Sequence, residues 1–166
     1  EKYKNYLNST IYNLNSTIEI RNIYFLTDSE ELTNYVRKQN INVITPYMRH
    51  NDSGETILGI LEDFIGRVKF DVDVSFLIAY ISDNDRYKQL CNEYLVSLNS
   101  SAIFAKENKG MFFKKSQDSF YRLDDQLGRY KGYKSPIYEV LDDCGYIVHI
   151  DNIKDGFLHK QDTLVI

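Results

Sequence analysis

The segment 124–131 brings together more chemically useful side chains than any other short stretch of this sequence. An acidic pair is followed directly by Gln126, and the basic residues Arg129 and Lys131 come next, in a stretch that also contains glycine. Carboxylate, amide and guanidinium groups are common in binding sites for polar ligands, and Arg can hold a carboxylate through two parallel hydrogen bonds. A solvated surface loop has the same composition, so the pattern leaves a ligand site and a polar surface both open.

Two further acidic patterns are weaker candidates for metal binding. Residues 71–73 read Asp-Val-Asp, but this pair opens an apolar run instead of following one, which favours a solvated strand edge. Residues 142–143 precede Cys144 and Gly145, which is the composition of a turn. His50, His149 and His159 are isolated from one another in the sequence, so we predict no histidine metal site.

The standard catalytic signatures are missing from the sequence. It contains no glycine-rich phosphate-binding loop, no zinc-binding His-Glu-x-x-His motif and no Gly-x-Ser-x-Gly elbow. Cys91 and Cys144 form neither a CxxC pair nor a metal-ligand cluster, which predicts two reduced thiols.

Alternating strand and helix patterns surround these residues. Val72–Ile81 is nearly all apolar, which is typical of a strand covered on both faces. Asp28 or Ser29 is placed to cap a helix whose first residues, Glu30 and Glu31, suit its positive end. The other segments follow the same rhythm: helices are expected near 3–14, 29–39, 55–66, 85–98 and 151–159, and strands at 18–26, 41–45, 101–105, 137–140, 145–150 and 163–166.

This order predicts one α/β domain over residues 1–166, built as three layers with a mostly parallel sheet between helices. Composition agrees with a soluble globular protein, with 43% hydrophobic and 27% charged residues. A net charge of −4 argues weakly against nucleic acid as a partner. No apolar run approaches the ~20 residues of a membrane helix and no signal peptide is evident, so we expect a cytoplasmic protein without a membrane partner.

Four stretches, taken in order, resemble the CMP-forming cytidylyltransferases that act on acidic sugars, the group of CMP-N-acetylneuraminate (CMP-sialic acid) synthetase. They read IYFLTDSEELTNYVRKQNINVI, MRHNDSGETILGILEDFI, VSFLIAYISDNDRYKQLCNEYL and GRYKGYKSPIYEVLDDCGYIVHIDNI. The resemblance implies a nucleotide-diphospho-sugar transferase-like fold with a small β arm. It also implies CMP transfer from CTP to an acidic sugar, with magnesium as the cofactor of the intact enzyme.

The same resemblance implies where the ligands bind and where the chain departs from the family. Gln126, Arg129 and Lys131 would bind the sugar acid, with Ser82 and Asp85 at the end of a strand. The family's phosphate loop has no counterpart here, the base-reading glutamine aligns with Ala79, and the late magnesium-binding aspartates would lie at or beyond Ile166. We therefore expect either an excised part of such an enzyme or a diverged relative. In both cases we expect that this chain by itself does not turn over CTP.

Two other functions remain open beside this nucleotidyltransferase. One is a non-catalytic binding or interaction domain on the same scaffold, which the alanine at position 79 favours. The other is a nucleotide-sugar glycosyltransferase that would use Asp71 and Asp73 for metal. Residues 110–134 mix aromatic and charged side chains, and we expect them to form the dimerisation arm of a homodimer, as the resemblance also implies.

Overall fold

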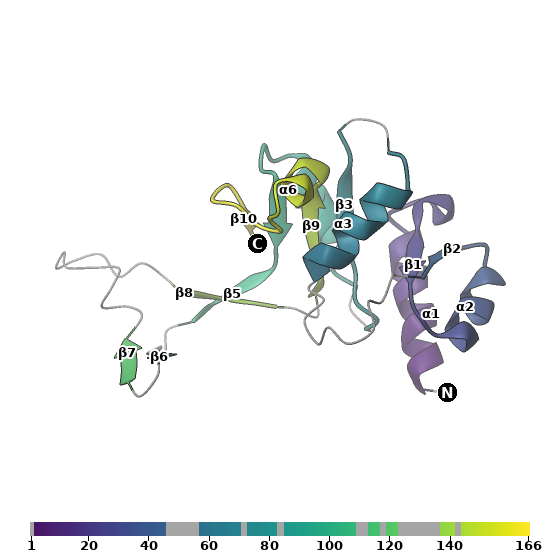
Figure 1. Cartoon of the computed structure of the whole chain (residues 1–166), viewed down its shortest axis with the longest axis horizontal. Coiled ribbons are helices and arrows are strands. Elements are labelled where there is room, and N and C mark those ends of the chain that lie inside the picture. Colours follow the sequence, from purple (N-terminus) through teal and green to yellow (C-terminus); the bar gives the residue numbers. More distant parts are fainter. Residues whose placement is uncertain are drawn as a thin grey trace. The chain divides into compact units, whose positions relative to one another are not determined.

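The computed structural model describes residues 2–45, 57–70, 73–82, 85–108, 113–116, 119–122, 137–141 and 144–166. The chain divides into two compact units (Figure 1). Unit 1 comprises residues 1–104 and 142–166, and unit 2 comprises residues 105–141. The predicted arm 110–134 lies inside unit 2.

Unit 1 alternates helices and strands as the sequence predicts. Its elements are α1 (Lys2–Asn15), the 3-10 helix η1 (Ile20–Asn22), β1 (Tyr24–Leu26), α2 (Glu30–Arg37), β2 (Asn42–Ile44), α3 (Ile57–Arg67), β3 (Ser75–Ile78), α4 (Tyr87–Leu95), β4 (Ser101–Ile103), β9 (Tyr146–His149), α6 (Ile150–Lys154) and β10 (Leu164–Val165). None of the helices in the described ranges is long and apolar enough to cross a membrane.

The strands of unit 1 form two sheets. β1 and β2 pair in parallel, and a separate four-stranded sheet has the order β10-β4-β9-β3. β9 is antiparallel to both of its neighbours, whereas β10 is parallel to β4, so this sheet is mixed. The expectation of a mostly parallel sheet is wrong here, because the alternation within a strand does not encode its direction.

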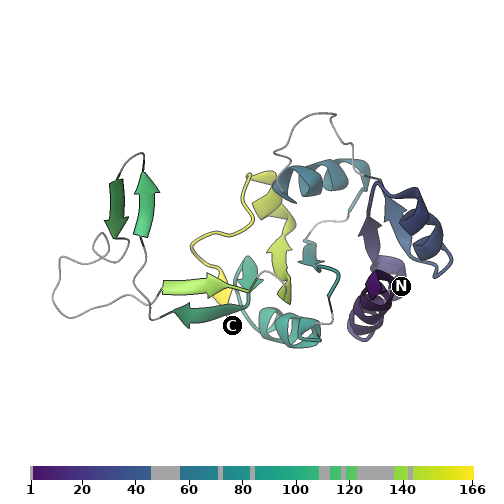
Figure 2. The same ribbon diagram turned by 90° about the horizontal axis from the view of Figure 1, so that it is seen from below.

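Helices cover both faces of the four-stranded sheet. Figure 2 shows α3 and α4 on opposite sides of β9. Phe64 on α3 contacts Phe76 on β3 with ring centroids 5.8 Å apart, while Leu90 on α4 is completely buried. The predicted α/β class is therefore confirmed.

The β1–β2 pair has its own apolar cluster beneath α1 and α2. Leu7 and Ile11 of α1 pack with Ile23, Val36 and Ile41, all of them buried. Apolar residues at positions 7, 11 and 14 recur at helical spacing, which is why α1 turns one face to this cluster. The polar face of the helix remains in solvent.

The N-cap prediction for α2 is confirmed at Ser29. Its side chain accepts a hydrogen bond from the backbone N–H of Leu32 at 3.3 Å, and Glu30 and Glu31 occupy the first turn. The apolar run before it is not one long strand, however. The N–H of Asn22 donates to the carbonyl of Glu19 at 2.8 Å and closes η1, so the strand is limited to 24–26.

One glycine permits the insertion of β9 beside β3. Gly145 has φ +70°, and a Cβ atom there would collide with the carbonyl oxygen of Ile78 and lie 3.2 Å from the Tyr87 ring. Only glycine combines this left-handed conformation with so close an approach. The register that follows pairs Ile78 with Tyr146.

Unit 2 consists of two antiparallel pairs in its described parts. β5 (Ala105–Asn108) pairs with β8 (Ile137–Val140), and β6 (Phe113–Ser116) pairs with β7 (Ser119–Arg122). β6 and β7 are the described part of the segment 110–134.

Candidate functional site

The strand expected at 72–81 is shorter, since β3 ends at Ile78, and Ser82 and Asp85 follow it in the segment that leads to α4. The backbone of Ser82 is fixed by α1: the Thr10 hydroxyl accepts from the Ser82 N–H at 3.0 Å and lies 2.7 Å from the Ser82 carbonyl oxygen, to which it can donate. Thr10 is itself 4% exposed. This contact ties the loop after β3 to a helix from another part of the chain. Asp85 is exposed just before α4.

A buried tyrosine holds the same loop from the other side. The Tyr87 hydroxyl donates to the carbonyl oxygen of Tyr80 at 3.0 Å and lies 3.5 Å from the Ser82 hydroxyl. Tyr87 has no exposed surface. The carboxyl end of β3 is therefore a rigid support, of the kind at which open α/β sheets bind their ligands.

Sequence reasoning missed an aromatic group at this edge. The ring of Tyr146 lies 6.5 Å from that of Tyr80 and 5.1 Å from that of His159, measured between centroids. Tyr146 stands at the start of β9, opposite Ile78 and Ile103. These aromatic residues are far apart in the sequence, and only the antiparallel insertion of β9 brings them together.

The environment shifts the ionisation of two members of this group. Burial raises the pKa of the Tyr146 phenol far above its ordinary value, and the nearby Tyr80 raises it further. Burial also lowers the pKa of His159. Both rings are therefore neutral at pH 7. The Tyr146 hydroxyl is buried beside Tyr80.

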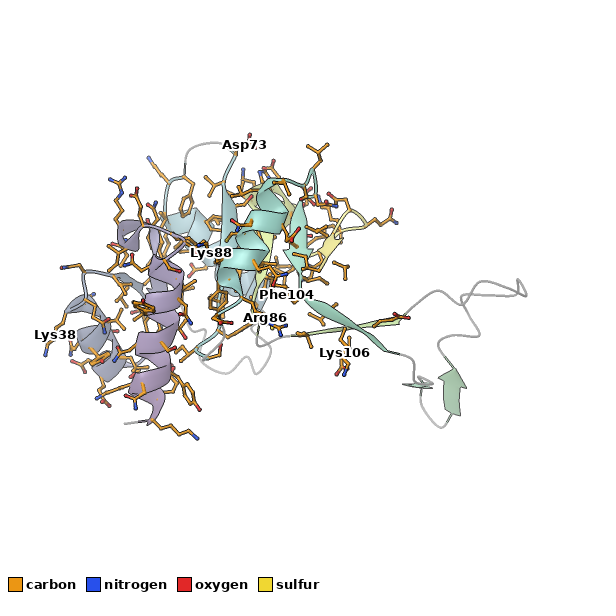
Figure 3. All side chains as sticks on the ribbon, turned by 180° about the vertical axis from the view of Figure 1, so that it is seen from behind. Lys38, Asp73, Arg86, Lys88, Phe104 and Lys106 are labelled. Atoms are coloured by element: carbon orange, nitrogen blue, oxygen red, sulfur yellow. The ribbon has the colours of Figure 1, made fainter. Side chains whose placement is uncertain are left out.

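A cation lies at the same end of unit 1. Arg86 directly precedes α4, and its guanidinium carbon lies 5.8 Å from the centre of the Phe104 ring. Figure 3 shows Arg86 and Phe104 at one end of α4 and Asp73 at the opposite end of the unit. The carboxyl end of β3 thus combines hydroxyl groups, neutral aromatic rings and one arginine.

The sugar-acid residues Gln126, Arg129 and Lys131 lie outside the described residues, as do His50 and Asp71. Ala79, at the position that the resemblance assigns to base reading, directly follows β3 and lines a hollow beside it. Its methyl group offers a base no hydrogen bond.

The second Asp of the Asp-Val-Asp pattern contacts a histidine. Asp73 Oδ1 lies 3.2 Å from His149 Nε2, and His149 Nδ1 accepts from the N–H of Asp151 at 3.3 Å. Within the described ranges, no three His, Cys, Asp or Glu side chains converge on a point that could hold a metal.

Neither Cys91 nor Cys144 forms a disulfide, so both are thiols, as predicted. Cys144 is buried, and burial raises the pKa of Cys91, which keeps that thiol protonated.

Comparison with known proteins adds no family. The sequence matches no protein-family model and no curated protein.

Proposed function

We propose that this chain carries a nucleotidyltransferase-like domain, with helices on both sides of a central sheet as three layers, and that its ligand site lies at the carboxyl end of β3. The observation that carries the proposal is the meeting of Ser82, Asp85, Arg86 and the Tyr80–Tyr146 pair at that end. A polar loop, a cation and neutral rings are the groups that a nucleotide requires.

Each group has a distinct role in this proposal. Arg86 supplies positive charge for phosphate oxygens, since a guanidinium binds them through two N–H donors. The half-buried ring of Tyr80 offers a face on which a base can stack. Thr10 and Tyr87 are positioning residues that hold the Ser82 loop at fixed distances. Catalysis by such enzymes depends largely on preorganised groups of this kind.

The acceptor in this proposal is an acidic sugar of the sialic acid type. Gln126, Arg129 and Lys131 supply the amide, guanidinium and ammonium groups that would hold its carboxylate and hydroxyls. Arg129 is the most specific of the three because its planar guanidinium matches a carboxylate.

One observation favours a non-catalytic binding domain as the second candidate. Ala79 stands where a base-reading amide is expected, and its side chain lines an apolar hollow. A domain of this kind would bind a nucleotide or sugar acid without turnover.

Titration of the isotope-labelled chain, followed by NMR, tests the site. CTP should shift the backbone signals of residues 80–86, and sialic acid should shift those near Arg129. Arg86→Gln should weaken CTP binding about tenfold, the loss expected for one charged contact of ~1.4 kcal/mol. Lys38→Gln removes the same charge on the far α2 side of unit 1 and should change nothing (Figure 3).

The same protein samples show whether residues 1–166 catalyse any turnover. Pyrophosphate release with CTP, magnesium and a panel of 2-keto sugar acids should stay at background for residues 1–166. Turnover that survives repurification would contradict the expectation that residues 1–166 lack part of the catalytic groups. Absence of CTP shifts at 80–86 would remove the proposed site altogether.

A further inference from the structure

Two strands of unit 1 turn unpaired edges toward each other. β1 hydrogen-bonds only with β2, and β3 lies at the end of the order β10-β4-β9-β3, among the strands that the structure describes. Neither strand contains a charged residue: β1 reads Tyr-Phe-Leu and β3 reads Ser-Phe-Leu-Ile. Natural edge strands are usually protected by charges, bulges or covering segments, because an apolar edge is a template for another strand.

The backbone register shows which groups these edges present. The N–H of Thr27 donates to the carbonyl of Ile44 on β2. Because the backbone N–H and C=O groups of successive strand residues point to opposite edges, those of Tyr24 and Leu26 point away from β2. On β3, the Val74 carbonyl accepts from Ile150 beside β9, so Ser75 and Leu77 face away from β9. Each edge therefore offers a row of backbone donors and acceptors.

An apolar slot of about 620 Å³ lies between the two edges. Every residue of β1 and β3 lines it. Its walls also include Ile11 and Leu14 of α1, Leu61 and Phe64 of α3, and the polar residues Asn22 and Lys69. Protein interiors are packed almost without voids and large exposed apolar grooves commonly mark binding sites, so a slot of this size and composition suits an apolar occupant.

The two helices already bridge the slot. On α3, the Phe64 ring lies 5.1 Å from Tyr24 of β1 and 5.8 Å from Phe76 of β3. On α1, Thr10 binds Ser82 beyond the end of β3, while Ile11 packs in the cluster beneath β1. Two strand edges with helices above and below are the surroundings of an interior strand in an α/β sheet.

The direction and the connection of such a strand follow from α1. β1 and β3 both begin at the end of unit 1 where η1 and Asp73 lie, and both run toward the end where α1 begins (Figures 1 and 3). A strand parallel to both would finish beside the first turn of α1. Strand, α1 and β1 would then form a βαβ unit, the usual connection between parallel neighbours.

We propose that the slot between β1 and β3 is filled by one further β-strand, parallel to both, from polypeptide that leads into α1. This strand joins the β1–β2 pair and the four-stranded sheet into one sheet. Because helices cover both faces, its sequence is a run of Val, Ile and Leu without charges. Its carboxyl end emerges beside Ser82, so the loop that follows it borders the site at the end of β3.

Hydrogen exchange on a fusion protein tests the strand. A six-residue Val/Ile segment and a loop of about five residues are joined to residues 1–166 ahead of α1. The amides of Leu26 and Leu77 should exchange at least tenfold more slowly than in the unfused chain. Those of Phe25 and Phe76, which already face β2 and β9, are internal controls and should change less.

A matched fusion with proline at alternate positions of the segment lacks the N–H donors that face one of the two edges, so it pairs less well and should protect Leu26 and Leu77 less. Should the first fusion not fold, the same segment is added to residues 1–166 as a separate peptide. Shifts of the Leu26 and Leu77 signals then support the proposal. Equal protection by the two segments, or no effect of the free peptide, overturns it.

Two results on the unfused chain would also overturn the proposal. Light scattering that gives a dimer, with Leu26 and Leu77 protected only in that dimer, would assign the slot to a second copy of this chain. A lipid or other apolar small molecule that copurifies and is displaced by no strand would assign the slot to a ligand.

Discussion

At the scale of single residues, Gly145 makes the sharpest demand on the fold. Its φ of +70° is unfavourable for other residues, and its Cα approaches the Ile78 carbonyl so closely that a Cβ would collide. Gly156 has φ +82° but has no atom within 4 Å of a built Cβ. A substitution at Gly156 would therefore cause backbone strain alone, whereas a substitution at Gly145 would cause both backbone strain and a steric collision.

Gly145→Ala should lower the free energy of unfolding by about 3 kcal/mol, because it adds the collision to the strain. Gly156→Ala, the matched control, should cost only about 1–2 kcal/mol for the left-handed backbone. Urea unfolding followed by circular dichroism measures both. Equal losses in the two variants would show that β9 can retreat from β3 at no cost.

Local chemistry made some residues predictable and left others beyond reach. Ser29 could be placed as a cap because an N-cap depends on its immediate neighbours. Ser82 and Asp85 followed from the end of an apolar run. Tyr146 and His159 could not be joined to Tyr80, since their contact depends on a strand direction that no local pattern records.

At the scale of elements, Ser100 connects three segments ahead of β4. Its carbonyl oxygen accepts from the N–H of His149 at 2.9 Å and from Asn152 Nδ2 at 3.2 Å. Its hydroxyl donates to Asp162 Oδ1 at 2.9 Å and accepts from Asn152 at 2.9 Å. Asn152, only 2% exposed, thus anchors α6 to the main sheet.

Asn152→Ala should lower the free energy of unfolding by about 2 kcal/mol, because two hydrogen bonds are lost and their partners on Ser100 stay partly buried. Asn92→Ala, on the exposed side of α4, should change it by less than about 0.5 kcal/mol. Chemical denaturation compares the pair. A loss for Asn152→Ala as small as that of the control would mean that α6 is held by its apolar residues alone.

Periodicity predicted most helices and strands but not their boundaries or directions. The β-branched run 18–26 was expected to be extended throughout, yet the carbonyls of Glu19 and Ile20 accept turn hydrogen bonds, and residues 20–22 form η1. The strand at 145–150 was expected, but its position between β3 and β4 depends on pairing across the whole chain.

At the scale of the whole molecule, we propose that the chain is a homodimer formed through residues 110–134. Phe112→Asp should then give a folded monomer, because an unpaired carboxylate in an apolar contact opposes association. Light scattering after size exclusion measures the mass. Val96→Asp places the same charge on a side chain that is 84% exposed in unit 1, and it should remain dimeric.

A wild-type protein that is monomeric at every accessible concentration would contradict the dimer. Unfolding of Phe112→Asp, with Val96→Asp still folded, would instead place Phe112 in the protein's own core.

The position of β9 also determines when the main sheet of unit 1 can form during synthesis. β3 and β4 both pair with β9 and not with each other, yet residues 146–149 leave the ribosome only after the whole of unit 2. At roughly 5–20 residues per second, β4 waits roughly 2–9 s for its partner. During that interval Ser101–Ile103, which are buried in the finished sheet, are open to chaperones and to other nascent chains. Codons that slow translation between 105 and 141 would lengthen this exposure. The rate at which unit 2 is synthesised therefore affects how long unit 1 is open to aggregation.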